Sequence, residues 1–229
     1  MRTAIFLGAG ASAAEGAPIQ NDLFKEYFKS VKSLPAAVRE GTEGEMKKEL
    51  LDFFRVMFDI DVRSIVPSSV TFPTFEEALG LLDLAELRRE AFKQYELEDF
   101  GRYGNRLRLV RKFMVFAMAK VINDALNRTK RLHESLVAKL GTSGLLTDTV
   151  FISTNYDIII DNVISRRSVN RPGENLDYGV EFTNFRRGDW SRPGPSAIPL
   201  YKLHGSLNWL YCANDNTLTL TPYEKGVID

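Results

Sequence analysis

Three short runs of mostly apolar residues stand out along the chain, and each is ended by glycine or by polar residues. They cover residues 3–7, 149–153 and 198–203. Apolar runs of this length, with little polar alternation, are typical of parallel strands buried on both faces of a sheet. We therefore predict three strands of a parallel sheet, and one more strand at residues 218–221.

Between the first two of these strands, apolar residues recur at helical spacing instead. The pattern predicts helices over residues 21–33, 45–58, 74–95, 103–128 and 133–140. Thr74 is placed to cap the third of these helices, and Gly141 to end the last. A further helix is predicted to begin at Asp157. Residues 165–197, rich in Arg, Pro, Gly and Asn, are predicted to form a long loop or a small irregular region.

The first predicted strand runs directly into a glycine turn, Gly8-Ala9-Gly10-Ala11-Ser12. Gly8 would permit a tight turn, and Gly10 would let backbone N–H groups approach a pyrophosphate. Ser12 and Glu15 are spaced for a capping box. A glycine turn needed only for packing is the alternative. Dehydrogenases carry an acidic residue about twenty residues further on, and its absence here argues against hydride transfer.

Apolar strands flanked by helices predict an α/β fold. With the glycine turn, we expect a Rossmann-like parallel sheet that carries a large all-helical insertion. The core is expected in residues 1–20 and 145–229, and the insertion in residues 21–144.

Composition bounds the size of the protein and the partners it binds. Its 229 residues suit one large domain or one domain with an insertion. Lys and Arg number 30, as do Asp and Glu, so no overall basic field attracts nucleic acid. A local basic cluster is predicted to be a solvated helix face rather than a binding patch. It consists of Arg102, Arg106, Arg108, Arg111 and Lys112.

The single cysteine, Cys212, excludes an internal disulfide framework and a zinc site built from four thiolates of this chain. It fits a reducing compartment, so we expect a cytoplasmic protein. No apolar run has the length of a membrane-spanning helix, and the N-terminus lacks the pattern of a signal peptide.

Polar residues stand where the predicted strands end. Asn155 and Asp157 follow the second strand, and His204 follows the third. Ligands of doubly wound sheets bind at the carboxyl ends of strands. Asn155 offers a donor and an acceptor, and an imidazole is a suitable general base at neutral pH. A local turn for Asn155 and a helix cap for Asp157 are the alternatives. His133, the other histidine, is interpreted as an ordinary residue at a helix start.

Together these motifs resemble the sirtuin family, whose sequences carry Gly-Ala-Gly-x-Ser and Gly-x-Pro, then Gln-Asn-x-Asp at a strand end, then His-Gly. In the same order, this chain has Gly8–Ser12, Gly16-Ala17-Pro18, Thr154-Asn155-Tyr156-Asp157 and His204-Gly205. The match covers roughly residues 3–21 and 148–210, and not the helical middle.

Two departures separate the chain from the protein deacylases of that family. Those have Asp-Phe-Arg after Gly-x-Pro, where this chain has Ile19-Gln20-Asn21. They also usually carry a four-cysteine zinc module, which Cys212 alone cannot supply. The chain more closely resembles the sirtuin-like domains of prokaryotic antiviral defence systems. That resemblance implies cleavage of NAD to nicotinamide and ADP-ribose, which depletes the cell's NAD after phage infection.

On this hypothesis NAD is the substrate and no metal is needed. The pyrophosphate is held by the backbone of Gly8, Ala9, Gly10, Ala11 and Ser12. Asn155 positions the ribose or the attacking water, and Asp157 orients Asn155 or contacts the nicotinamide side. His204 accepts a proton from water or from a ribose hydroxyl, so Asn155 and His204 are the expected catalytic residues.

The family fold has further strands after the His-Gly motif, so we expect the chain to be a fragment of a longer protein. The resemblance leaves room for a regulatory domain or partner protein beyond Asp229 and for a homo-oligomer, with no membrane or nucleic-acid partner. Two other functions stay open. A protein deacylase or ADP-ribosyltransferase would need an acylated or acceptor protein, and a sensor module would bind NAD or ADP-ribose without turnover.

Overall fold

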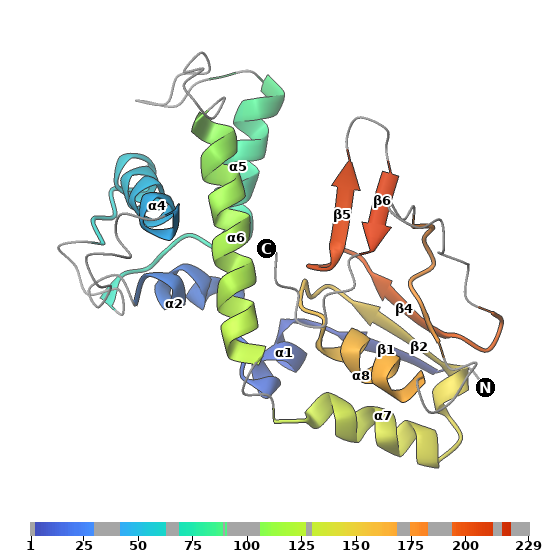
Figure 1. Cartoon of the computed structure of the whole chain (residues 1–229). Coiled ribbons are helices and arrows are strands. Elements are labelled where there is room, and N and C mark those ends of the chain that lie inside the picture. The colour runs from blue at the N-terminus through green and yellow to red at the C-terminus, as the bar shows by residue number, and fades with distance from the viewer. Residues whose placement is uncertain are drawn as a thin grey trace. The chain divides into compact units, whose positions relative to one another are not determined.

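The structure, a computed structural model, describes residues 3–29, 42–62, 69–88, 90, 106–126, 130–168, 175–182, 194–212 and 217–220. The chain divides into two compact units. The first comprises Met1–Ala17 with Ile122–Asp229, and the second comprises Pro18–Val121. Figure 1 shows the helices and strands of both. The glycine turn and both polar strand ends belong to the first unit.

The first unit is built on a four-stranded sheet whose strand order is β1-β2-β4-β3. Figure 1 labels β1, β2 and β4. The strands of this sheet are β1 (Thr3–Leu7), β2 (Thr149–Ser153), β3 (Leu176–Asp177) and β4 (Ile198–Lys202). Every neighbouring pair is parallel. All elements described between β1 and β2 are helices. The predicted α/β fold, a Rossmann-like parallel sheet with a helical insertion, is therefore confirmed.

Two strands lie where none was predicted. β3 falls inside the segment predicted to be irregular, and its two residues pair with Ile198 and Pro199 of β4. β5 (Trp209–Cys212) pairs antiparallel with β6 (Thr217–Leu220) in a separate two-stranded sheet. A strand of two residues leaves no pattern in a sequence, whereas the apolar run of β5 does and could have been recognised.

One face of the parallel sheet is buried by α7 (Leu132–Thr142) and α8 (Ile159–Ser168). Side chains of these helices and of the strands share one core cluster, which includes Val137, Ile160, Ile164, Phe151 and Leu200. The register places Phe6, Ile152 and Tyr201 on the opposite face, where Phe6 is 64% and Tyr201 41% exposed. Among the described residues the two faces of this sheet thus differ in burial, whereas the sequence predicted burial of both faces.

The end of α7 corrects one prediction. Gly141 does not stop this helix, which continues to Thr142 with Ser143 as its C-cap. The left-handed conformation that favours glycine falls at Gly144, with φ of 71°. Two backbone bonds close the turn, from Gly144 N to Gly141 O (3.3 Å) and from Leu145 N to Leu140 O (2.9 Å).

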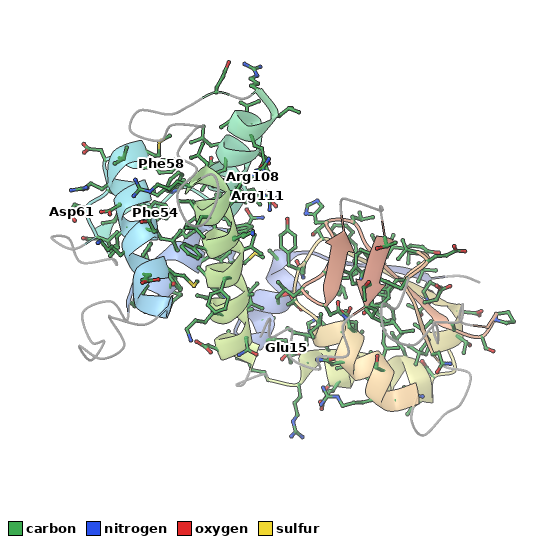
Figure 2. The ribbon with its side chains drawn as sticks, turned by 45° about the horizontal axis from the view of Figure 1, so that its top comes forward. Glu15, Phe54, Phe58, Asp61, Arg108 and Arg111 are labelled. Carbon is green, nitrogen blue, oxygen red and sulfur yellow. The ribbon has the colours of Figure 1, made fainter. Side chains whose placement is uncertain are left out.

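The regular elements that the structure describes in the second unit are all helices, and aromatic rings fill its core. It contains α2 (Leu23–Lys29), α4 (Thr42–Phe58), α5 (Phe75–Arg88) and most of α6 (Arg106–Leu126). Phe54 of α4, labelled in Figure 2, meets Phe24 edge to face with ring centroids 4.6 Å apart. Even α6, with its 21 residues, lacks the apolar stretch of a membrane-crossing helix, as do the other described helices.

These helices match the predicted ones, except that α5 ends at Arg88 and Glu90, predicted to be helical, is not. Thr74 caps α5 as predicted, because its hydroxyl accepts a bond from Glu77 N (3.1 Å) while Glu77 Oε2 accepts one from Thr74 N (2.7 Å). This reciprocal pair is a capping box. The predicted helical residues 30–33, 89, 91–95, 103–105 and 127–128 lie outside the described ranges.

Three arginines of the basic cluster are paired with acidic residues of neighbouring helices. Arg106 Nε lies 2.8 Å from Glu49, Arg108 Nε 2.7 Å from Glu86, and Arg111 Nε 2.6 Å from Asp83. Figure 2 labels Arg108 and Arg111. Arg102 lies outside the described residues. Ion pairs on a solvated helix face account for these three arginines, as the sequence predicted.

Candidate functional site

The carboxyl ends of three neighbouring strands meet at one edge of the parallel sheet. Leu7 of β1 pairs with Ser153 of β2, which pairs with Lys202 of β4, so the last residues of the three strands are in register. The glycine turn begins directly after Leu7, the segment with Asn155 after Ser153, and the segment with His204 after Lys202. The fold therefore brings all predicted site residues to the same edge.

The glycine turn leads straight into the short helix α1 (Ala9–Glu15). Gly8 occupies the N-cap position with φ of −91° and ψ of −176°, an extended conformation open to any residue. A Cβ on Gly10 would meet no atom within 4 Å, and one on Gly8 would make only an ordinary contact with Phe6. Neither glycine is required by the fold around it, which argues against the alternative of a turn that serves packing alone.

The predicted capping box of Ser12 and Glu15 is wrong. The helix begins at Ala9, four residues before the start that a Ser12 cap requires, so Ser12 lies within it. No side chain caps this helix at Gly8. The residue of α1 that does require glycine is Gly16, which ends the helix with φ of 108°.

Ser12 instead joins the glycine turn to the end of β2. Its hydroxyl donates to Asp157 Oδ2 (2.5 Å) and accepts from Asn155 Nδ2 (2.8 Å). Asn155 Nδ2 also donates to the carbonyl of Gly8 (2.9 Å). Since that carbonyl can only accept, it fixes the orientation of the amide and turns Nδ2 toward the glycine turn. Asn155 Oδ1 is thus the polar atom that this side chain offers to a ligand.

Asp157 is buried and caps the next helix. Its Oδ1 accepts a bond from Ile159 N (3.1 Å) at the start of α8, while its Oδ2 accepts from Ser12. The alternative role given to this residue, a helix cap, is therefore present in the structure. Through Ser12 the same carboxylate also holds Asn155 in place.

His204 lies on the surface beside Tyr156, with the two ring centroids 6.1 Å apart. Gly205 follows it in the left-handed conformation, with φ of 82°, which accounts for glycine after this histidine. Leu207 N then donates to Tyr156 O (2.9 Å). An exposed imidazole is thus held next to the segment that carries Asn155.

His133 has a partner in the structure that no sequence pattern indicated. This histidine is buried, and its Nδ1 (2.8 Å) and its backbone N (2.7 Å) both bond to Glu15 Oε1. Burial acts to raise the pKa of Glu15, but the bonds and the charge of His133 outweigh it and lower that pKa. His133 is therefore not an ordinary helix-start residue, because it joins α7 to the end of α1.

Sequence reasoning also missed three buried polar residues behind the strand ends. Lys202 Nζ donates to the backbone carbonyl of Asp157 and lies 3.4 Å from Asp161 Oδ2. Tyr178 donates to the other oxygen of Asp161 (2.5 Å). Lys202 lies within an apolar run that predicts a strand, and Asp161 lies within a predicted helix. Neither residue belongs to a recognisable motif.

Within the described ranges, no group of three or more His, Cys, Asp or Glu side chains is arranged to hold a metal ion. No family model matches the chain, and no curated protein matches it. The resemblance to sirtuins therefore rests on the motif residues alone and stays a prediction.

Proposed function

We propose that the protein is an NAD glycohydrolase, which uses water to cleave NAD into ADP-ribose and nicotinamide. One observation carries the proposal. The three motifs that suggest NAD chemistry follow strand ends that are in register across β1, β2 and β4. Ligands of such sheets bind at this edge.

The open glycine turn supports binding of the pyrophosphate. Ala9, Gly10 and Ala11 begin a helix directly after Gly8, and no described atom outside this helix's backbone lies within 4 Å of a Cβ position on Gly10. A ligand can therefore approach the backbone closely there. Backbone N–H groups at the start of a helix favour a negatively charged group.

The proposed reaction is hydrolysis of one N-glycosidic bond. The bond between the ribose C1′ and the nicotinamide nitrogen breaks, nicotinamide leaves with the bonding electrons, and the oxygen of water bonds to C1′. The ribose carries oxocarbenium-like charge in the transition state. Asn155 Oδ1 would accept a hydrogen bond from the water or from a ribose hydroxyl, and His204 would take the proton that water loses.

The test mixes purified protein with NAD and measures nicotinamide by chromatography. We expect turnover by the wild type and a loss of about 10²–10⁴-fold in His204→Ala, the usual worth of a general base. Lys139→Met, an exposed substitution on α7, serves as the control and should match the wild type. Equal rates for the wild type and His204→Ala would remove His204 from the mechanism, and no nicotinamide at all would refute the proposal.

A binding module without turnover is the second candidate, and one observation favours it. Ser12 and Asp157 are buried and bonded to each other and to neighbouring groups, which suits a rigid binding site. Calorimetry would then show NAD or ADP-ribose binding while chromatography shows no product. Transfer to a protein, by contrast, would require an acceptor before NAD is consumed.

A further inference from the structure

A buried charged pair lies behind the candidate site. Lys202, the last residue of β4, has a fully buried side chain, and Asp161 in the first turn of α8 is only 3% exposed. The ammonium nitrogen lies 3.4 Å from Asp161 Oδ2 and also donates to the backbone carbonyl of Asp157. Burying two charges is costly, and a pair of apolar side chains would often serve stability as well. Packing alone therefore does not explain why Lys202 and Asp161 are buried.

Hydrogen bonds connect this pair to the segment after His204. Asp161 Oδ1 accepts from the hydroxyl of Tyr178, which in turn accepts from Asn208 Nδ2 (3.3 Å). Burial and the neighbouring Asp161 raise the pKa of Tyr178 far above its ordinary value, so its hydroxyl keeps the proton that it donates. Each link of this chain of bonds is thus made by a defined donor and acceptor.

The geometry places the turn from Asn155 to Asp157 between two anchors. On one side Lys202 Nζ holds the carbonyl of Asp157. On the other, Leu207 N holds the carbonyl of Tyr156 (2.9 Å). Both anchors come from the segment that contains His204, one before it and one after it. The segment that offers the acceptor Asn155 and the segment that offers His204 are therefore tied at two points.

We propose that Lys202 and Asp161 are positioning residues, whose buried pair sets the place of His204 relative to Asn155. Neither side chain reaches a ligand, because both are enclosed by protein. They act through the Asp157 carbonyl and through the bonds that run on to Asn208. The inference rests on the proposed function only for its effect on turnover, since the placement of the two segments can be measured without NAD.

The chain has only two histidines, so the imidazole NMR spectrum of the full chain reports both directly. His204→Ala assigns the two signals. In Lys202→Met with Asp161→Asn, which removes both charges, we expect the His204 signals to move and the cross-peak between His204 and Tyr156 to weaken. The His133 signals should stay, because its partner Glu15 is untouched. Lys139→Met, which removes an exposed lysine of the same unit, should move neither.

Kinetics with NAD separate positioning from binding. We expect kcat of the double variant to fall at least about tenfold, because a small misplacement of a reacting group slows the reaction strongly. KM should change less than about threefold. Unchanged His204 signals together with an unchanged kcat would overturn the inference. If the wild type shows no turnover, the proposed function fails, and the NMR comparison still decides on the positioning.

Loss of the native His133 signals would reveal that the double variant does not fold. A second variant tests the inference in that case. Lys202→Arg keeps the charge beside Asp161 but places a larger head group against the Asp157 carbonyl. It should move the His204 signals in a folded protein. If it leaves them and kcat unchanged, the buried lysine does not set the position of His204.

Discussion

Glu15 shows how a single buried carboxylate couples the fold to pH. Its Oε1 accepts two bonds from His133, and the backbone of Lys130 also favours the charged carboxylate. The net effect is a pKa below the ordinary value of 4.5. A carboxyl with a lowered pKa in the folded state stabilises the protein above its unfolded pKa, and this contribution is lost as the pH falls through the folded value.

We expect Glu15→Gln to lower the free energy of unfolding at pH 7 by about 1–3 kcal/mol, because a neutral amide is a weaker acceptor and its NH₂ group would be buried unpaired. The loss should shrink as the pH falls from about 4.5 downward, where the wild type loses the same contribution. Urea unfolding at several pH values measures both. The control is Glu134→Gln on the same unit, whose side chain is 42% exposed. Parallel pH profiles for wild type and Glu15→Gln would contradict the assignment.

At the scale of elements, α1 separates a glycine that the fold needs from one that it does not. Gly16 ends the helix with φ of 108°, whereas Gly10 lies in the helix with open space where a Cβ would stand. Gly16→Ala should therefore cost about 1–3 kcal/mol of stability. Gly10→Ala should cost none and gain up to about 1 kcal/mol, since alanine is the better helix former.

The same pair of variants tests whether the glycine turn binds the pyrophosphate of NAD. With Gly10→Ala, a methyl group fills the space through which the ligand would approach, so we expect KM for NAD to rise about tenfold or more at undiminished stability. Gly16→Ala should leave KM near the wild-type value in the fraction that is folded. Chemical denaturation and initial rates at varied NAD measure the two effects separately. An unchanged KM in Gly10→Ala would mean that the turn binds no pyrophosphate.

The elements also show which features a sequence can and cannot predict. The strands at residues 3–7 and 149–153 were predicted to the residue because an apolar run between polar residues is a local signal. β3 left no such signal, since a strand of two residues leaves no pattern in a sequence. The end of α7 depended on which of two glycines takes the left-handed conformation, and backbone geometry rather than composition decides that.

For the whole molecule, the candidate site depends on contacts between distant parts of the chain. The sequence placed Asn155 and His204 at strand ends, and the sheet brings those ends together. It could not predict that Ser12 would bond to Asp157, that Glu15 would meet His133, or that Lys202 would be buried. Residues far apart along the chain form each of these bonds, so only the register of the strands and the packing of the helices fix them.

Each of the two units has a core of its own, and this predicts that they can be destabilised separately. Phe54 is fully buried among rings of the second unit, including Phe24 and Phe28. Phe54→Ala should cost about 3–5 kcal/mol through the cavity it leaves. Hydrogen exchange should then show faster exchange in α2 and α4, while β2 and β4 keep most of their protection. Leu87→Ala, at a residue 81% exposed, should change neither unit. Equal loss of protection in β2 and β4 would show instead that the chain unfolds as one cooperative unit.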